Sequence, residues 1–267
     1  MLSKVIAFVY DEKRKPETIV FAKSAIKELS KYKDTTVKEN PDDFYKGIDA
    51  VIVYGGDGLL LHTANRIAKF EIPIIGVNYG RVGYLCKIEP ITSDSHLMAI
   101  YDIVDDIDDN KLMIDNRTRI SAEINGKYVT DALNEISIGG INRTVYLRIT
   151  NKYINELNLK AIGDGIIFST RTGSTAYNIN AGGSVLLDEN VFSVVANNSI
   201  FQSDKLPVNT KSLITSSETT FNINLMNKNK ENVPFLVADG QRTIKLDRDD
   251  IITIRKSKYS TKFIQLH

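Results

Sequence analysis

The sequence has few of the features that define several classes of protein. It contains one cysteine, Cys86, so no internal disulfide can form and a disulfide-stabilised secreted scaffold is excluded. The apolar run near the N-terminus covers about seven residues, which is too short for a membrane span, and it lacks the small-residue cleavage site of a signal peptide. These absences predict a cytoplasmic protein that has no membrane partner.

The sequence also has no excess charge of one sign. Its 34 Lys and Arg residues almost balance 33 Asp and Glu residues, which leaves a formal net charge of +1 at pH 7. No global field would recruit nucleic acid, and nucleic acid is therefore not expected as a partner. The 267 residues are 42% hydrophobic and 25% charged, which is enough apolar material for one large domain or two smaller ones.

The hydrophobic pattern differs between two parts of the chain. The first part alternates between strand-like and helix-like runs, with strands expected over residues 4–10, 49–54 and 72–77 and helices over 17–32 and 59–70. Such alternation predicts a parallel sheet covered by helices. From about residue 105 the runs are typical of strands, and Asn125-Gly126 between two of them is a strong hairpin signal.

The expected fold class is therefore an α/β N-terminal domain with a parallel sheet, residues 1–104, plus an all-β C-terminal domain, residues 105–249. The one helix candidate in the second part follows Gly173. The acidic stretch over residues 101–110 is interpreted as a solvated linker at the boundary.

The first stretch that indicates chemistry is Gly55-Gly56-Asp57-Gly58, where a strand passes into a helix expected to start at Gly58 or Leu59. Glycines allow a sharp turn and a close approach of a ligand, and a helix N-terminus favours an anion such as phosphate. The charge of Asp57 would repel that anion. Asp57 is therefore expected either to cap the helix or to take part in chemistry beside the phosphate.

Two further stretches carry polar residues within apolar surroundings. Asn134 and Glu135 are adjacent in an expected strand, where they could hold a ribose diol or, on an edge strand, face water. Small hydroxyl side chains gather beside Gly173, followed by Tyr177, and they predict a site for polar ligand groups. The loop at residues 76–85, with the sequence GVNYGRVGYL, is expected to be a structural turn.

Other site types are not supported by the sequence. There is no Walker motif, so a P-loop kinase is excluded. His62, His96 and Cys86 have no partners at metal-ligand spacing, and the aspartates of residues 102–109 lack the calcium-loop pattern. No set of protein ligands for a metal is predicted.

The stretches GGDG, NYGRVGYL, NE and TRTGSTAYNINAGG, in this order, resemble the motifs of the NAD kinase family over nearly the whole chain. GGDG alone also occurs in lipid kinases and phosphofructokinases, whereas TGSTAYN preceded by GDG and NE is specific. The resemblance implies transfer of a phosphoryl group from ATP, accompanied by Mg²⁺ or another divalent cation, to the 2′-hydroxyl of the adenosine ribose of NAD, giving NADP. It also implies an active site between the domains, a homodimer or homotetramer, and a terminal segment, residues 250–267, that returns to the first domain.

The resemblance also implies roles for individual residues. Asp57 would be the catalytic base, and Gly55, Gly56 and Gly58 would shape the turn that binds the phosphates of ATP. The NAD-binding residues would be Asn134, Glu135, Asp164, Ser174, Thr175, Ala176 and Tyr177. Two positions depart from the usual family pattern: Leu59 follows GGDG where many members have Thr, and Arg171 stands where Pro is usual.

Two alternatives stay open at this point. One is a lipid kinase that shares the GGDG motif, and the other is a non-catalytic sensor of NAD or NADP that has kept the fold. The sequence leaves open whether the donor is ATP or polyphosphate and whether the acceptor is NAD or NADH. It also leaves open feedback by NADP and the choice between dimer and tetramer.

Overall fold

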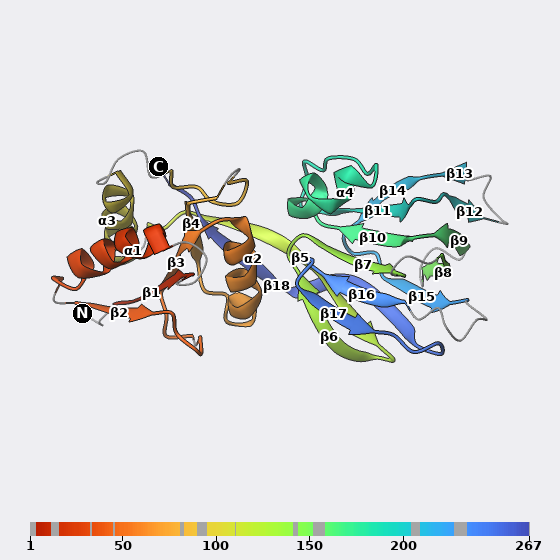
Figure 1. The fold of residues 1–267 in the computed structure, drawn as a ribbon, viewed down its shortest axis with the longest axis horizontal. Helices are drawn as coiled ribbons and strands as arrows, with labels where there is room; N and C mark the ends of the chain where they lie inside the picture. Colours follow the sequence, from red (N-terminus) through yellow and green to blue (C-terminus); the bar gives the residue numbers. More distant parts are fainter. Residues whose placement is uncertain are drawn as a thin grey trace. The chain divides into compact units, whose positions relative to one another are not determined.

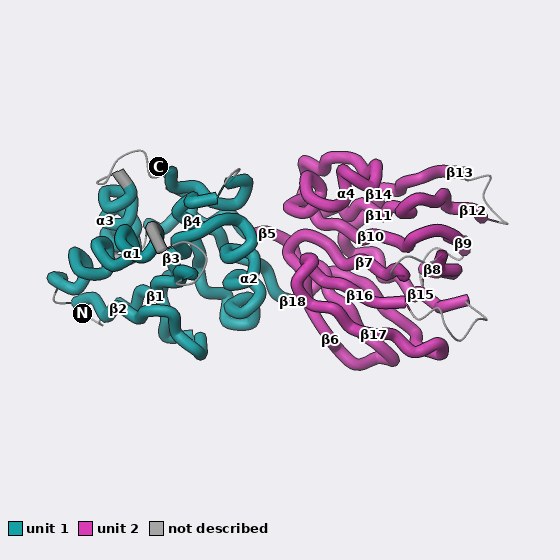
Figure 2. The backbone as a smooth tube through the Cα atoms, viewed as in Figure 1, with its two compact units in different colours: residues 1–116, 259–267 teal, residues 117–258 magenta. Residues whose placement is uncertain are grey.

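The chain divides into two compact units (Figures 1 and 2): unit 1 contains residues 1–116 and 259–267, and unit 2 contains residues 117–258. The boundaries expected from the sequence were 104/105 and 249/250. The structure, a computed structural model, describes residues 4–11, 16–32, 34–44, 46–80, 83–89, 95–109, 111–140, 144–151, 158–203, 209–226 and 234–266. Arg81 and Val82 of the NYGRVGYL stretch lie outside the described residues.

Unit 1 is built on a parallel sheet. Its strands lie in the order β2-β1-β3-β4, and each neighbouring pair is parallel. The strands are β1 (Lys4–Tyr10), β2 (Thr35–Glu39), β3 (Ala50–Gly55) and β4 (Ile74–Asn78). Because helices cover both faces of such a sheet, β3 is a continuous apolar run that is fully buried. The predicted parallel α/β part is confirmed; the short strand β2 was not anticipated from its polar sequence.

The helices of unit 1 cover the two faces of this sheet. α1 (Pro16–Leu29) and α3 (Ser95–Asp108) share one hydrophobic cluster with β1, β3 and β4. α2 (Asp57–Ile67), which continues into the 3₁₀ turn η1 (Ala68–Phe70), packs on the opposite face, where Leu60 lies beside Gly76. Gly76 faces away from the cluster because its neighbours along β4, Ile75 and Val77, both belong to it.

The interpretation of residues 101–110 as a solvated linker is wrong. Most of this stretch belongs to α3, and Ile100, Ile103 and Val104 are fully buried in the core of unit 1. These apolar residues follow one another at helical spacing, while Asp102 and Asp105 on the other side are exposed. The acidic composition hid an amphipathic helix.

Unit 2 consists of antiparallel strands, as predicted, and two layers of these strands enclose one core. A six-stranded sheet has the order β14-β11-β10-β7-β16-β17, and a second run of strands has the order β13-β12-β9-β8-β15-β18, with β5 pairing β18 and β6. Alternate residues of both, such as Ile138, Phe168, Ile149 and Ile223, are buried in a single cluster. The bounds are β5 (Ile114–Ile124), β6 (Lys127–Ala132), β7 (Glu135–Gly139), β8 (Val145–Asn151), β9 (Asn158–Gly163), β10 (Gly165–Ser169), β11 (Val191–Asn197), β12 (Phe201–Ser203), β13 (Asn209–Thr210), β14 (Ser212–Ser216), β15 (Phe221–Leu225), β16 (Phe235–Ala238), β17 (Arg242–Lys245) and β18 (Ile251–Ile264).

The hairpin signal at Asn125-Gly126 is confirmed. These two residues connect β5 to β6 and have positive φ angles of 52° and 76°, which suit the twist of the paired strands. The helix expected after Gly173 is short: a 3₁₀ turn, η2 (Thr172–Thr175), precedes the single turn α4 (Tyr177–Asn180). The end of β18 pairs in parallel with β4, Phe263 opposite Ile74, and the last residues of the chain belong to unit 1.

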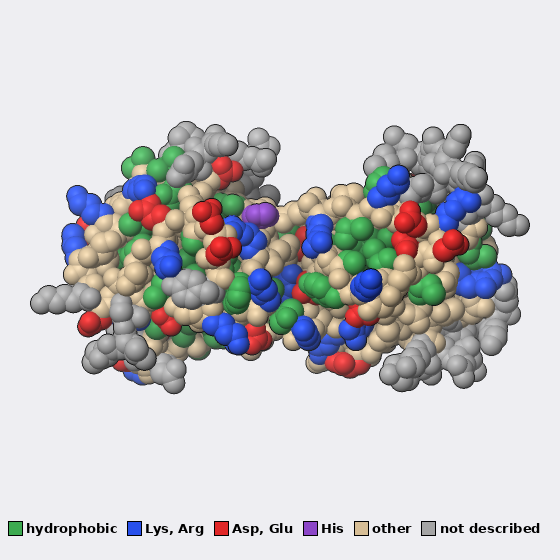
Figure 3. All heavy atoms as spheres, turned by 90° about the horizontal axis from the view of Figure 1, so that it is seen from below, with side chains coloured by type: hydrophobic (Ala, Val, Ile, Leu, Met, Phe, Trp, Pro, Cys, Tyr) green, Lys and Arg blue, Asp and Glu red, His purple; other side chains and the backbone are tan. Residues whose placement is uncertain are grey.

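On the face drawn in Figure 3, basic and acidic side chains are interspersed over each unit. This distribution agrees with the near balance of charges in the sequence. In the described part of the chain, no helix has both the length and the apolar character needed to span a membrane.

Candidate functional site

The Gly55–Gly58 turn of unit 1 joins β3 to α2. Helix α2 begins at Asp57, one residue earlier than predicted, and its N-cap is Gly56, which has an extended backbone (φ −101°, ψ 179°). Among the described residues no side chain caps this helix, so the interpretation of Asp57 as an N-cap is wrong. The positive end of the helix dipole is left for another anion.

The carboxylate of Asp57 binds a different segment of unit 1. Its Oδ2 accepts a hydrogen bond from the backbone N–H of Tyr84 (2.9 Å), and its Oδ1 accepts from those of Leu85 (3.0 Å) and Cys86 (3.4 Å). The carboxylate of Asp57 is thus oriented by backbone donors. Burial, reinforced by the nearby Asp57, raises the pKa of the Cys86 thiol to about 12.

The three glycines of the turn have different surroundings. A Cβ on Gly56 would lie 3.3 Å from Cα of Gly80, so the turn and the NYGRVGYL loop approach each other closely, and Tyr79 N–H donates to Gly55 O (2.8 Å). A Cβ on Gly58 would meet no heavy atom within 4 Å in the described structure. The side of the turn at Gly58 therefore has room for a ligand.

In unit 2, Asn134 and Glu135 lie at a bend and not in the middle of one strand. β6 ends at Ala132 and β7 begins at Glu135, so Asn134 belongs to the connection. The alternative of two water-facing edge residues is wrong for Glu135, because β7 is an inner strand and Glu135 is only 7% exposed. Leu133, a fully buried side chain, holds the bend in the core.

The environment of Glu135 favours its protonated form. Burial first, and then the neighbouring carboxylate of Asp239, raises the pKa of Glu135 to about 7, while a backbone hydrogen bond from Tyr177 acts in the opposite direction. Glu135 therefore changes its protonation state near neutral pH. A carboxyl group of this kind can donate or accept a hydrogen bond according to pH.

The segment after β10 folds against this bend. Thr170 Oγ1 donates to Leu133 O (2.6 Å), and the Thr170 N–H donates to Asn134 O (2.9 Å). A Cβ on Gly173 would lie 2.1 Å from Asn134 O, so a glycine is required where the two backbones meet. The structure therefore brings Asn134 and Glu135 together with the segment that contains Ser174 and Tyr177.

The predicted residues of this segment are placed differently from one another. Ser174 is fully buried, and its hydroxyl donates to Arg171 O (2.7 Å) and accepts from Leu186 N–H (3.0 Å). This geometry favours a role for Ser174 in shaping the loop. Thr175 is exposed, and the partly buried Ala176 donates its N–H to Gly173 O (2.9 Å).

Three buried polar atoms around the bend have no hydrogen-bond partner within the described part of the chain. They are Oδ1 of Asn134, Oε2 of Glu135 and Oγ1 of Thr172. Such atoms are costly to bury unless a ligand or water satisfies them. Thr172 is one of the small hydroxyl residues beside Gly173, but sequence reasoning did not select it as a site residue.

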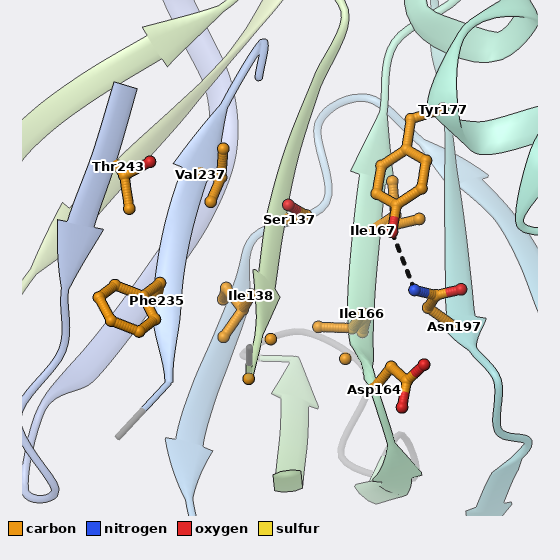
Figure 4. Close-up of a pocket in the computed structure, with 13 residues that line it drawn as sticks. Ser137, Ile138, Asp164, Ile166, Ile167, Tyr177, Asn197, Phe235, Val237 and Thr243 are labelled. Atoms are coloured by element: carbon orange, nitrogen blue, oxygen red, sulfur yellow. Dashed lines mark hydrogen bonds between the residues drawn. The ribbon is translucent and has the colours of Figure 1, made fainter. Parts of the chain in front are cut away.

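Asp164 and Tyr177 line a pocket of about 400 Å³ in unit 2 (Figure 4). Figure 4 shows the ring of Tyr177 directed along β10 toward Asn197, and Asp164 beyond it. The Asn197 side chain donates to the Tyr177 hydroxyl (2.9 Å). Because Tyr177 is 43% exposed, the interpretation that it only packs a helix onto the sheet is wrong.

Two asparagines that sequence reasoning missed hold this pocket. Asn197 binds Tyr177, and the side chain of Asn198 donates to Oδ2 of Asp164 (2.6 Å). The pair Asn197-Asn198 at the end of a strand was the signal that could have identified them, since asparagine tolerates the left-handed conformation that Asn198 adopts (φ 48°).

Arg171, which replaces the usual proline, has a defined partner. Its guanidinium binds Oε1 of Glu189 (3.0 Å), and Oε2 of Glu189 accepts the N–H of Thr118 (2.8 Å). The arginine therefore connects the TGSTAY segment to β5. This contact holds the start of the loop in place without the proline.

Comparisons with known proteins agree with these motifs. The family model described as the ATP-NAD kinase N-terminal domain matches residues 2–105, and the model of the ATP-NAD kinase C-terminal domain matches residues 113–266. An NAD kinase of Lachnoclostridium phytofermentans is 30% identical over 231 residues, covering 83% of this chain and 76% of the relative. An NAD kinase of Methanosarcina acetivorans is 26% identical over the whole chain and 88% of its own length.

Solved structures show the same fold. Yeast NADH kinase complexed with NADH aligns with a TM-score of 0.80 at 17% identity, covering 100% of this chain and 84% of its own. An NAD kinase from Archaeoglobus fulgidus in complex with ATP aligns with a TM-score of 0.70 at 24% identity, covering 98% of this chain and 93% of its own.

Proposed function

Because the chain belongs to the NAD kinase family, we propose that it phosphorylates NAD with ATP as the donor. The oxygen of the 2′-hydroxyl on the adenosine ribose forms a bond to the γ-phosphorus of ATP, the bond from that phosphorus to the β,γ-bridging oxygen breaks, and ADP leaves. The hydroxyl proton passes to a base. The products are NADP and ADP.

Asp57 is our candidate for that base. Its two oxygens each accept backbone hydrogen bonds from the 84–86 segment, which fixes the plane of the carboxylate and leaves further lone pairs for a substrate hydroxyl. Acceptance of the proton during attack is the role that an oriented carboxylate can perform in phosphoryl transfer. Gly55, Gly56 and Gly58 would bind phosphate oxygens at the N-terminus of α2, and the open side of Gly58 supports this placement.

We propose that a divalent cation, Mg²⁺ by preference, accompanies ATP. Mg²⁺ takes oxygen ligands, commonly one or two carboxylates together with substrate phosphates and waters. The single carboxylate and the backbone groups of the Gly55–Gly58 turn fit that donor chemistry. When bound, the cation neutralises charge on the phosphates.

The bend at Asn134 and Glu135 would hold the ribose. One observation carries this proposal. Oδ1 of Asn134 and Oε2 of Glu135 belong to adjacent residues, and both are buried without a hydrogen-bond partner in the described structure. A ribose diol offers both donors and acceptors to such a pair. Asp164 and Tyr177 would contact NAD from the pocket, and Ser174, Thr175 and Ala176 would shape or line the intervening loop.

The proposal is tested by incubating the purified chain with NAD, ATP and Mg²⁺ and measuring NADP with an NADP-specific dehydrogenase. A non-catalytic sensor would bind NAD in calorimetry but form no NADP. The remaining alternative, a lipid kinase, is disfavoured by the match of both NAD kinase domain models.

Several finer properties are predictions of the same proposal. Activity assays that compare ATP with polyphosphate and NAD with NADH would identify the preferred donor and acceptor. Assays with added NADP would reveal feedback inhibition. A homodimer or homotetramer is expected in light scattering coupled to gel filtration. A cytoplasmic location is expected in cell fractionation.

A further inference from the structure

The buried carboxylate beside Glu135, that of Asp239, has no role in the proposed site. Asp239 follows β16, in the turn that leads into β17, and its φ angle of 52° is left-handed. Turn aspartates normally face water, whereas Asp239 is only 6% exposed. A carboxylate is buried at such cost only where it has strong partners.

The partners of Asp239 are backbone groups of the bend. Its Oδ2 accepts from Leu133 N–H (2.9 Å), and its Oδ1 accepts from Asn134 N–H (2.7 Å) and from Glu135 N–H (3.2 Å). In return, the Asp239 N–H donates to Glu135 O (3.0 Å). Three consecutive donors of one connection therefore converge on a single side chain.

The chemistry of this arrangement suits an aspartate and not an asparagine. Three converging donors need a group that only accepts, and an amide would place its own NH₂ against one of them. The fully buried Arg119 supplies the compensating charge, because its guanidinium is attracted electrostatically both to Asp239 and to Asp131. Asp131 lies on β6, and its buried Oδ1 has no hydrogen-bond partner in the described part of the chain.

We propose that Asp239 is a positioning residue for NAD: it fixes the backbone at residues 133–135 so that the side chains of Asn134 and Glu135 are held ready for the ribose before the substrate arrives. The inference rests on the proposed function of that bend. In this proposal Asp239 does not itself contact the substrate, and removal of its carboxylate should weaken the binding of NAD more than the binding of ATP.

The test compares two variants of the full chain, Asp239→Asn and Asp131→Asn. Each removes one carboxylate near Arg119, but only the first replaces one of the two oxygens that accept from the bend with an NH₂ donor. Steady-state kinetics with NAD, ATP and Mg²⁺ give the two KM values, and thermal melts give the stability of each variant.

Asp239→Asn should raise the KM for NAD at least tenfold and change the KM for ATP less than twofold. It should also move the pH profile of NAD affinity to lower pH, because Glu135 faces the charge of Asp239 and the backbone N–H of Tyr177, and the first of these is lost. Asp131→Asn should leave both KM values within twofold even where its melting temperature falls.

Equal changes of both KM values in Asp239→Asn, or the same rise in KM for NAD in both variants, would overturn the inference. A wild-type chain that neither binds NAD nor forms NADP would overturn the proposed function and the inference with it. If Asp239→Asn does not fold, hydrogen exchange on the wild type decides. The amide hydrogens of residues 133–135 should be protected from exchange in the absence of NAD, and their exchange rates should change less than twofold when NAD is added. Rapid exchange in the free protein would contradict the proposal.

Discussion

The carboxylates of Asp57 and Glu135 have opposite surroundings. Asp57 accepts hydrogen bonds from backbone N–H groups, whereas Glu135 is buried beside a second carboxylate and its pKa is raised to about 7. The first environment orients a carboxylate through backbone donors, and the second favours the neutral form of Glu135. Two acidic residues of one chain are thereby fitted for different roles, a proton acceptor and a pH-sensitive contact.

Replacement of Asp57 by Asn should reduce turnover by about 10²–10⁴, because proton acceptance is lost. The side-chain size is kept, while the amide NH₂ replaces one of the two oxygens that accept from the 84–86 backbone. NAD binding should stay within a few-fold of wild type. Turnover is followed through NADP formation and binding by calorimetry. A variant that keeps more than half of the activity would show that Asp57 is needed only to hold the 84–86 segment.

Glu135 should make the stability of the chain depend on pH. Its pKa is raised from 4.5 to about 7 in the folded state, so the folded state binds more protons between those values. The contribution is complete below about pH 4.5 and is lost as pH rises through 7, a change on the order of 3 kcal/mol. Urea unfolding of the wild type and Glu135→Gln at pH 5 and pH 8 measures it.

The difference in unfolding free energy between the two proteins should favour the wild type more at pH 5 than at pH 8. If the difference is the same at both pH values, Glu135 does not titrate in this range. The same variant should also raise the KM for NAD more than that for ATP at pH 8, which is above the pKa of Glu135, since a hydrogen bond to a charged group is worth roughly 1.5–3 kcal/mol.

Tyr177→Phe should fold normally and weaken NAD binding by about 1 kcal/mol, the usual value of one neutral hydrogen bond. The hydroxyl is held by Asn197 at the pocket, and the ring is too exposed to support the core. Tyr177→Ala should weaken binding further at little cost in melting temperature. Calorimetry and thermal melts check both. A Phe variant that binds NAD as well as wild type would remove the hydroxyl from the site.

At the scale of elements, the candidate site is a set of loops at strand ends held in place by backbone contacts. The turn before α2 touches the loop at Gly80, and the bend before β7 touches the loop at Gly173. Glycines are needed at these positions because a second backbone occupies the space of a side chain. The rigid strands on either side give the loops their precision.

Gly173→Ala should separate this contact from the general effect of adding a methyl group. The new Cβ would lie 2.1 Å from Asn134 O, so the bend must move, at a cost of typically 1–3 kcal/mol and with a higher KM for NAD. Gly58→Ala, whose Cβ meets nothing within 4 Å in the described structure, is the matched control for stability. Melting temperatures that fall equally in both variants would refute the crowding at Gly173.

Local chemistry made some elements predictable and tertiary contacts decided the others. The hairpin at Asn125-Gly126 follows from left-handed φ angles that few residues adopt, and the buried strands follow from apolar runs. The helix α3 was missed because its acidic face dominated the composition. Asp239 was not identified from the sequence, since its three hydrogen bonds join residues more than a hundred positions apart.

At the scale of the whole molecule, each unit supplies a different part of the candidate chemistry. Unit 1 carries Asp57 and the glycine turn at the end of a parallel sheet, where a helix N-terminus favours phosphate. Unit 2 carries the bend, the TGSTAY loop and the pocket on antiparallel strands. The order of motifs along the sequence was sufficient to predict both the fold class and the family, because each motif occurs where one element ends and the next begins.

The most direct measurement is the formation of NADP by the purified wild-type chain supplied with NAD, ATP and Mg²⁺, with ADP quantified in the same reaction. We predict that NADP and ADP appear in equal amounts, that an NADP-specific dehydrogenase accepts the product, and that Asp57→Asn forms it at most about a hundredth as fast. A folded wild-type chain that releases ADP without NADP, or that forms neither, would contradict the assignment.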